Sequence, residues 1–199
     1  VKMLPIEGYE APTSLSIVLR DNMGCTPAMA GGGRISCNIG WFRRNLKGEA
    51  IGSVVHEMVH VVQQYGRTRR GDPSYTRPPG WLVEGIPDYI RWFLYEPQVK
   101  GAEITERNFA RARYDASYRV SGNFLNWAVE KYDRELVTKL NAAARQGRYR
   151  EDLWKEYTGK TLPELGAEWR ENNRVRLGLP LENAAEPKAA ASSNTATNR

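Results

Sequence analysis

Residues 56–60 read His-Glu-Met-Val-His, and this run contains both histidines of the 199-residue chain. Two histidines four residues apart lie on one face of an α-helix, where both imidazoles can bind the same zinc ion. Glu57, which follows the first histidine, can then deprotonate a water molecule on that ion. The motif therefore indicates a zinc hydrolase with His56 and His60 as metal ligands and Glu57 as general base. An amphipathic helix whose polar face meets solvent is the alternative for so short a match.

The sequence around the motif predicts an amphipathic helix over residues 51–65. At about 100° per residue, the apolar side chains form one stripe, made of Ile51, Val54, Val55, Met58 and Val62. The polar side chains lie on the opposite side, and they are Ser53, His56, Glu57, His60, Gln63 and Gln64. We expect the apolar stripe to pack into a core and the polar side to face a cleft. Gly66 is the expected end of the helix.

A catalytic zinc ion usually takes three protein ligands, so a third ligand is expected outside the motif. Residues 80–92 read Gly-Trp-Leu-Val-Glu-Gly-Ile-Pro-Asp-Tyr-Ile-Arg-Trp and predict a second helix over 83–95. Glu84 and Asp88 share one face of it, because they are four residues apart. Glu84 is the candidate ligand, and Asp88 is the candidate acceptor for the free ring N–H of a ligand histidine. An exposed Asp88–Arg91 ion pair is the alternative.

These two blocks resemble the plant basic secretory protein family and its bacterial relatives. The resemblance rests on Val-Val-His-Glu-Met-Val-His-Val-Val-Gln (54–63) and Gly-Trp-Leu-Val-Glu-Gly-Ile-Pro-Asp-Tyr-Ile-Arg (80–91), with weaker likeness from about Ser14 to about Asn173. It implies a zinc peptidase of the zincin group, with the gluzincin arrangement of HExxH and a downstream glutamate. The implied roles are zinc ligands for His56, His60 and Glu84, general base for Glu57, and an outer hydrogen-bond partner for Asp88.

One residue departs from the family pattern. Pro87 stands where the family usually has a small, alanine-like residue. A proline has no backbone N–H, and its ring crowds the carbonyl group four residues earlier, which here belongs to Val83. The second helix is therefore expected to begin near Val83 or to kink there.

Attack on a peptide carbonyl builds negative charge on its oxygen, which a donor besides the metal should stabilise. The chain has no third histidine, so a tyrosine or an arginine must supply this donor. Tyr118 is the first choice, because Tyr-Arg-Val-Ser-Gly-Asn-Phe (118–124) resembles a family segment downstream of the glutamate. Tyr114, Arg91 and Arg119 are alternatives.

The rest of the chain predicts one α+β domain over residues 1–182. Residues rich in β-formers predict strands at 14–20 and 34–41, with Gly31-Gly32-Gly33 between them. The later signals predict helices at 51–65, 83–95, 104–114, 117–132, 134–146, 150–157 and 162–175. The resemblance implies a zincin-like fold, in which a small N-terminal sheet lies over the active-site helix and the C-terminal part is mainly helical. It also implies that the strand at 34–41 forms the upper rim of the cleft.

Three local features complete this organisation. Thr161 and Glu164 predict a capping box at the start of the last helix. Residues 66–79 are rich in glycine, proline and arginine, and predict a loop that either contacts substrate or merely connects the two ligand helices. Residues 183–199 have almost no bulky side chains, so a disordered tail is expected.

The net charge of +6 favours acidic partners, but no nucleic-acid motif accompanies it, so nucleic-acid binding is not expected. No apolar run is long enough to span a membrane. We expect a peptide or protein substrate and a monomer. The loop before the second helix contains four arginines, Arg67, Arg69, Arg70 and Arg77. Their positive charge could favour acidic substrates.

Cys25 and Cys37 bracket the glycine-rich break between the predicted strands. A single disulfide bridge between them is an open alternative if the protein is exported. A cysteine protease is not favoured, because no histidine is left to activate a thiol. The family resemblance alone implies a secreted or periplasmic location, since no signal peptide is visible at the start of this chain.

Two other functions agree with the same motifs. One is a zincin-shaped binding module that holds metal without catalysis. The other is a zinc hydrolase acting on a bond other than a peptide bond, because the metal ligands do not choose the bond that is cleaved.

Overall fold

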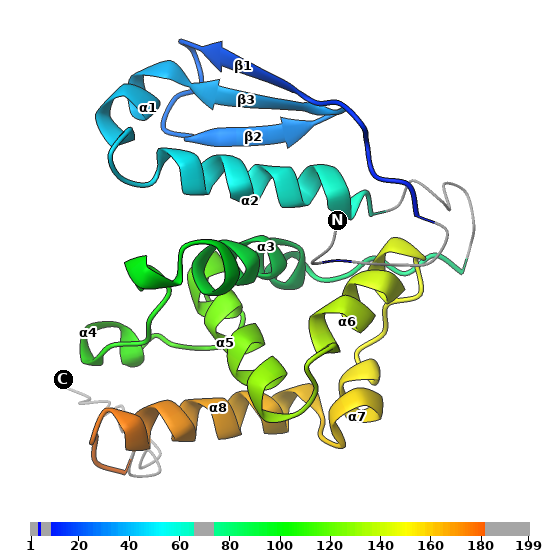
Figure 1. Cartoon of the computed structure of the whole chain (residues 1–199). Helices are drawn as coiled ribbons and strands as arrows, with labels where there is room; N and C mark the ends of the chain where they lie inside the picture. The colour runs from blue at the N-terminus through cyan, green and yellow to red at the C-terminus, as the bar shows by residue number, and fades with distance from the viewer. Residues whose placement is uncertain (1–3, 5–8, 66–73, 182–199) are drawn as a thin grey trace, which may run out of the picture.

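Figure 1 shows a computed structural model of the chain, in which Leu4 and residues 9–65 and 74–181 are described. Strands come first and helices follow, so the fold is α+β, as predicted. The sheet and α2 (Ala50–Gln63) form the upper part of the molecule in Figure 1, and α3 to α8 lie below them. No helix in the described part of the chain has the length and apolar character needed to cross a membrane.

The described residues form a small sheet and a series of short helices. The strands are β1 (Ser16–Arg20), β2 (Ala28–Gly31) and β3 (Arg34–Asn38). The other helices are α1 (Ile39–Asn45), α3 (Gly80–Tyr89), α4 (Glu106–Phe109), α5 (Tyr118–Lys131), α6 (Leu136–Arg145), α7 (Leu153–Thr158) and α8 (Leu162–Arg176). A π-helix, η1 (Ile90–Tyr95), and a 3₁₀ turn, η2 (Pro97–Val99), follow α3.

The sheet has the order β1-β3-β2, with β1 parallel and β2 antiparallel to β3. Gly32 and Gly33 form the two-residue turn of the β2–β3 hairpin, and their φ angles of 56° and 76° suit a type I′ turn. The strand predicted at 34–41 ends at Asn38, because the Asn38 side chain accepts a hydrogen bond from the Trp41 N–H (3.1 Å) and caps α1. Neither β2 nor α1 was predicted.

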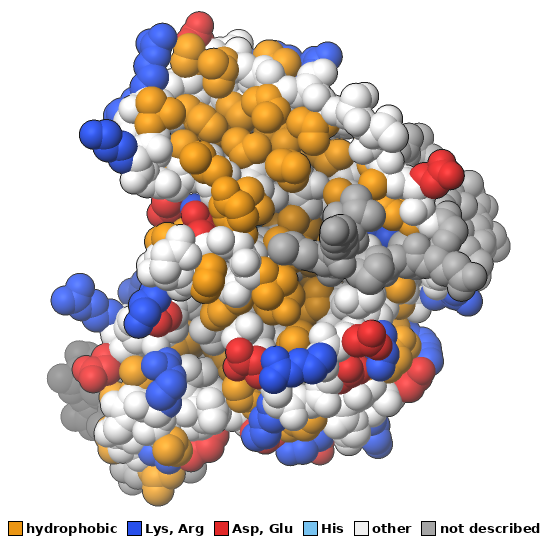
Figure 2. Space-filling model, in the orientation of Figure 1, with side chains coloured by type: hydrophobic (Ala, Val, Ile, Leu, Met, Phe, Trp, Pro, Cys, Tyr) orange, Lys and Arg blue, Asp and Glu red, His pale blue; other side chains and the backbone are white. Residues whose placement is uncertain are grey.

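α2 does not bury the stripe of apolar side chains that its sequence predicts. Ile51 and Met58 are 61% and 43% exposed, whereas Val59 and Val61 are buried. α2 contacts β2 and β3 on one side and α3 on the other (Figure 1). The expectation of a buried stripe is therefore wrong for Ile51 and Met58, whereas Val54 is partly buried against the core beside the sheet. Figure 2 shows that hydrophobic side chains lie on the surface of the upper part of the molecule.

The end of α2 also differs from the prediction. The helix ends at Gln63, and Gln64 caps it with a left-handed φ of 45°. Gly66, the predicted stop, lies outside the described residues.

α3 begins at Gly80, so Pro87 lies inside the helix and not in its first turn. The expected start near Val83 is therefore wrong. The Val83 carbonyl has no residue-87 N–H to bind, and it accepts a hydrogen bond from the Gln63 side chain instead (2.9 Å). Regular α-helical bonding gives way to the π-helix from Ile90 onward.

The predictions for α5 to α8 agree with the structure to within three residues. The helix predicted at 104–114 shortens to α4, since turns follow Phe109. The capping box is present, with the Thr161 N–H donating to Glu164 Oε2 (2.7 Å). Both cysteine thiols are free, and Cys37 is buried against α2. The predicted tail, 183–199, lies outside the described residues.

The main core lies among α3 and α5 to α8, and it is built on fully buried Phe124, Trp154 and Trp169. Within it, α3 and α5 approach closely because Gly122 has no side chain. A Cβ atom at Gly122 would lie 2.9 Å from the backbone of Asp88 and Tyr89. This contact fixes the helix that carries Glu84 and Asp88.

Gly122→Ala should therefore lower the free energy of unfolding by about 1–3 kcal/mol, because the added methyl group meets backbone and not a flexible side chain. Gly80→Ala is the matched control, since a Cβ there meets nothing within 4 Å. Chemical denaturation of both variants and the wild type tests this. Equal stability of the two variants would contradict the close approach of α5 to α3.

Candidate metal centre

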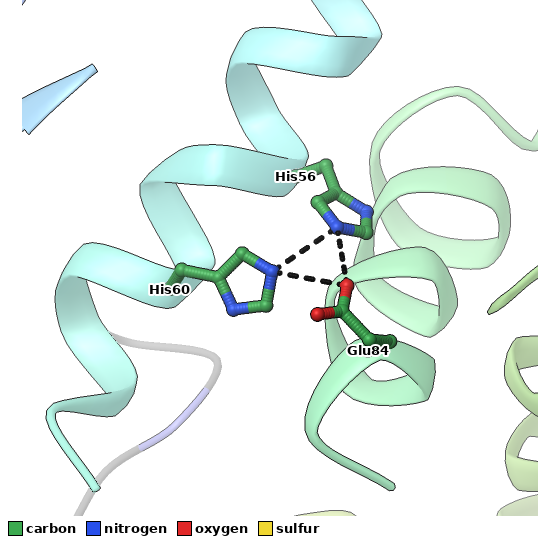
Figure 3. A group of neighbouring side chains, drawn as sticks. All are labelled: His56, His60 and Glu84. Carbon is green, nitrogen blue, oxygen red and sulfur yellow. Dashed lines mark hydrogen bonds and ion pairs between the residues drawn. The ribbon is translucent and has the colours of Figure 1, made fainter. Parts of the chain in front are cut away.

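Three side chains from two helices converge on one point. His56 and His60 project from α2 toward Glu84 on α3 (Figure 3). The two Nε2 atoms lie 3.2 Å apart, and each lies 3.2 Å from Glu84 Oε2. Ligand atoms around a tetrahedral zinc ion lie about 3.3 Å apart when the bonds are about 2.0 Å long. The spacing therefore fits a small divalent ion, and the structure brings together all three predicted ligands.

Hydrogen bonds behind the rings determine which nitrogen carries the proton. The His56 Nδ1–H donates to Asp88 Oδ1 (2.7 Å), so Asp88 lies where the sequence predicts it. Gln63 uses its Nε2 to donate to Val83, so its Oε1 must accept from the His60 Nδ1–H (2.7 Å). In the neutral rings, both Nε2 atoms therefore direct lone pairs toward Glu84. Such a group of acceptors is stable only with a proton or a metal ion between them.

The charges of the site agree with this need. Burial disfavours the charged form of His56, but hydrogen bonds to Asp88 and Glu84, together with the negative charges of Asp88 and Glu57, raise its pKa to about 9. Burial also disfavours the charged form of Glu84 and so raises its pKa, but hydrogen bonds from His56 and His60 outweigh this effect and lower the pKa to about 2. The site thus attracts one positive charge in a largely buried position.

The three side chains open into a cleft of about 1160 Å³. Residues 26–30, α2, α3 and residues 116–119 line it. The strand predicted for the rim, 34–41, is instead the central strand β3, and the edge strand that borders the cleft is β2. Of the predicted loop 66–79, only 74–79 lies within the described residues, and exposed Arg77 from it lines the cleft.

Glu57 and Tyr118 both line this cleft. The Ala30 N–H of β2 donates to Glu57 Oε2 (2.7 Å), which fixes the carboxylate beside the metal ligands. Tyr118 is the first residue of α5, and its ring stacks on His56 with centroids 6.0 Å apart. The negative charge of Glu84 raises the pKa of Tyr118, so its hydroxyl stays protonated at neutral pH.

The family model described as a peptidase of plants and bacteria matches residues 21–169. The chain belongs to this family. The matched range contains the motif helix and the second ligand helix, so the predicted resemblance to the basic secretory proteins is confirmed. Comparisons with curated proteins and with solved structures gave no match.

In this family member, the three alternatives to Tyr118 as the donor to the carbonyl oxygen form other contacts. Tyr114 packs in the core against Trp81 and Phe124, with centroids 5.1 and 5.3 Å apart. Arg91 is buried and pairs with two carboxylates, Glu49 (3.1 Å) and Glu96 (2.7 Å). Arg119 also pairs with Glu49 (2.6 Å). Tyr118 is therefore the candidate donor that the structure leaves beside the metal ligands.

Gln63 is the site residue that sequence reasoning missed. It was assigned only to the polar side of α2, although it follows His60 by three residues and so lies on a neighbouring part of the helix surface. The contact with Val83 depends on α3 and has no sequence signal of its own.

Binding of Zn²⁺ should weaken about tenfold per pH unit from about pH 8 to about pH 6, because one proton must leave His56, whose pKa is about 9. Competition with a chromophoric chelator at each pH measures this slope. Asp88→Asn keeps an acceptor for the His56 Nδ1–H but removes the charge, so the slope should become shallower. Wild-type affinity that does not change with pH would contradict this electrostatic description.

Proposed function

We propose that the protein is a zinc-dependent metallopeptidase with a zincin-like arrangement. The observation that carries this proposal is the convergence of His56, His60 and Glu84 at 3.2 Å spacing beside Glu57. Membership of a family described as peptidases supports the reaction class and a peptide or protein substrate.

Two imidazoles and one carboxylate form a ligand set that zinc uses in catalytic sites with one position left for water or substrate. When bound, the ion supplies Lewis acidity to water and to the scissile carbonyl group. Asp88 holds the His56 ring with Nε2 directed toward His60 and Glu84, where the ion would bind.

Glu57 acts as the general base. Its Oε2 is held by the Ala30 N–H, while Oε1 has no hydrogen-bond partner among the described residues. The free oxygen can accept a proton from the attacking water and then deliver it to the leaving amine. Tyr118 donates its hydroxyl proton in a hydrogen bond to the carbonyl oxygen as negative charge develops there.

The substrate lies extended along β2. This strand is at the edge of the sheet and borders the cleft, so a peptide can pair with its outward backbone groups. The Ala30 N–H already points away from β3 toward α2, since it binds Glu57.

Glu57→Gln should lower kcat/KM on a quenched fluorescent peptide library by about 10²–10⁴-fold, because the amide cannot accept the proton. Zinc content should stay at the wild-type value, since Glu57 is not a ligand. His60→Ala should lose both zinc and turnover. Undiminished turnover in Glu57→Gln would remove Glu57 as the base, and a zinc-loaded wild type that cleaves no peptide would favour a binding module.

Tyr118→Phe should lower kcat by about 10²–10³-fold with little change in zinc affinity, because one donor to the developing oxyanion is lost. Tyr95→Phe is the control, since Tyr95 is similarly exposed (48% against 54%) and does not line the cleft. Steady-state kinetics on one cleaved peptide separates kcat from KM. A Tyr118→Phe enzyme as fast as the control would exclude this donor.

A further inference from the structure

Gln63 joins the two ligand helices through both ends of its side-chain amide. Its Oε1 accepts from the His60 Nδ1–H (2.7 Å), and its Nε2 donates to the Val83 carbonyl (2.9 Å). Gln63 is buried, with 2% of the residue exposed, so bulk water has little access to its amide. Of the side chains of this length, only an amide provides an acceptor and a donor together.

The Val83 carbonyl is open to Gln63 because of Pro87. In a regular α-helix the N–H of residue 87 would bind this carbonyl, and proline has none. The Gln63 amide therefore satisfies a carbonyl group that α3 itself leaves without a partner. Val83 directly precedes Glu84, and the bond therefore ends beside the third metal ligand.

The backbone of Gln63 is held as firmly as its side chain. Arg145 of α6 donates to the carbonyl oxygens of Gln63 (3.2 Å) and Val62 (3.0 Å), and the Tyr9 hydroxyl also donates to Val62 (2.7 Å). These bonds satisfy carbonyl groups in the last turn of α2, which a helix cannot satisfy internally. Hydrogen bonds therefore hold both the backbone of Gln63 and, through Val83, the end of its side chain.

We propose that Gln63 is a positioning residue of the metal centre. It keeps the proton of His60 on Nδ1, so that Nε2 faces the ion, and it fixes the distance between His60 and Glu84 by joining α2 to α3. The role rests on the metal site proposed above. It complements Asp88, because His56 is supported by a carboxylate and His60 by a neutral amide.

Two substitutions separate positioning from simple packing. Gln63→Met keeps the length of the side chain but removes both hydrogen bonds, and Zn²⁺ affinity should fall about 10–100-fold. Gln63→Glu restores an acceptor for the His60 Nδ1–H but cannot donate to Val83, so its affinity should lie closer to wild type than that of Gln63→Met. Gln98→Met, at an exposed glutamine, should leave affinity unchanged.

Chelator competition with Zn²⁺ measures these affinities, and circular dichroism checks that each variant is folded. Equal affinity in Gln63→Met and wild type would overturn the positioning role. Equal weakening in both Gln63 variants would overturn the part of the role that acts through the His60 Nδ1 proton, because Gln63→Glu keeps only that acceptor. These are binding measurements, so they do not depend on whether peptides are cleaved. A wild type that binds no Zn²⁺ would overturn the metal site and this role together, whereas loss of peptidase activity alone would not affect it.

A measurement on the wild type avoids any folding defect in a variant. In the Zn²⁺-loaded protein, ¹⁵N NMR should find His60 bound to the metal through Nε2, with a slowly exchanging proton on Nδ1. Coordination through Nδ1 would overturn the inference, because that nitrogen could then not donate to Gln63.

Discussion

The structure depends on holding three electron-rich atoms 3.2 Å apart, two imidazole nitrogens and one carboxylate oxygen. Without a proton or a cation between them, these three acceptor atoms repel one another. The surrounding bonds oppose this repulsion. Asp88 and Gln63 fix the rings from behind, and the close packing of Gly122 against α3 fixes the backbone that carries Glu84. The fold thus supplies the rigidity that a metal ion requires of its ligands.

The candidate ligands could be predicted from the sequence because helical geometry fixes their spacing. His56 with His60, and Glu84 with Asp88, are each four residues apart, so each pair shares a helix face wherever the helix lies. β2 could not be predicted in this way, since Ala-Met-Ala-Gly has no β-branched residue and its pairing is decided by the glycine turn that follows. Gln63 escaped prediction because its role depends on a carbonyl group in another helix.

The prediction that α2 buries its apolar stripe failed for a related reason. Periodicity identifies an apolar stripe, but it does not say which flank of a helix meets its neighbours. Here the sheet lies against one flank and α3 against the other, so His56 is buried while Ile51 is exposed. The contacts of α2 with the sheet and with α3 therefore decide which of its residues are buried.

Pro87 disrupts α3 by the usual local rules, yet it is consistent with the site. Its missing N–H gives Gln63 a carbonyl to bind at one end of α2, and the π-helix that follows carries Arg91 to Glu49 at the other end. Gly52 makes room for this second contact, since a Cβ there would lie 2.4 Å from Arg91 Nε. α2 is therefore tied to the second ligand helix and its π-helical extension at both ends. One contact near each end of the helix restricts both its rotation and its translation, and this holds both histidines close to Glu84.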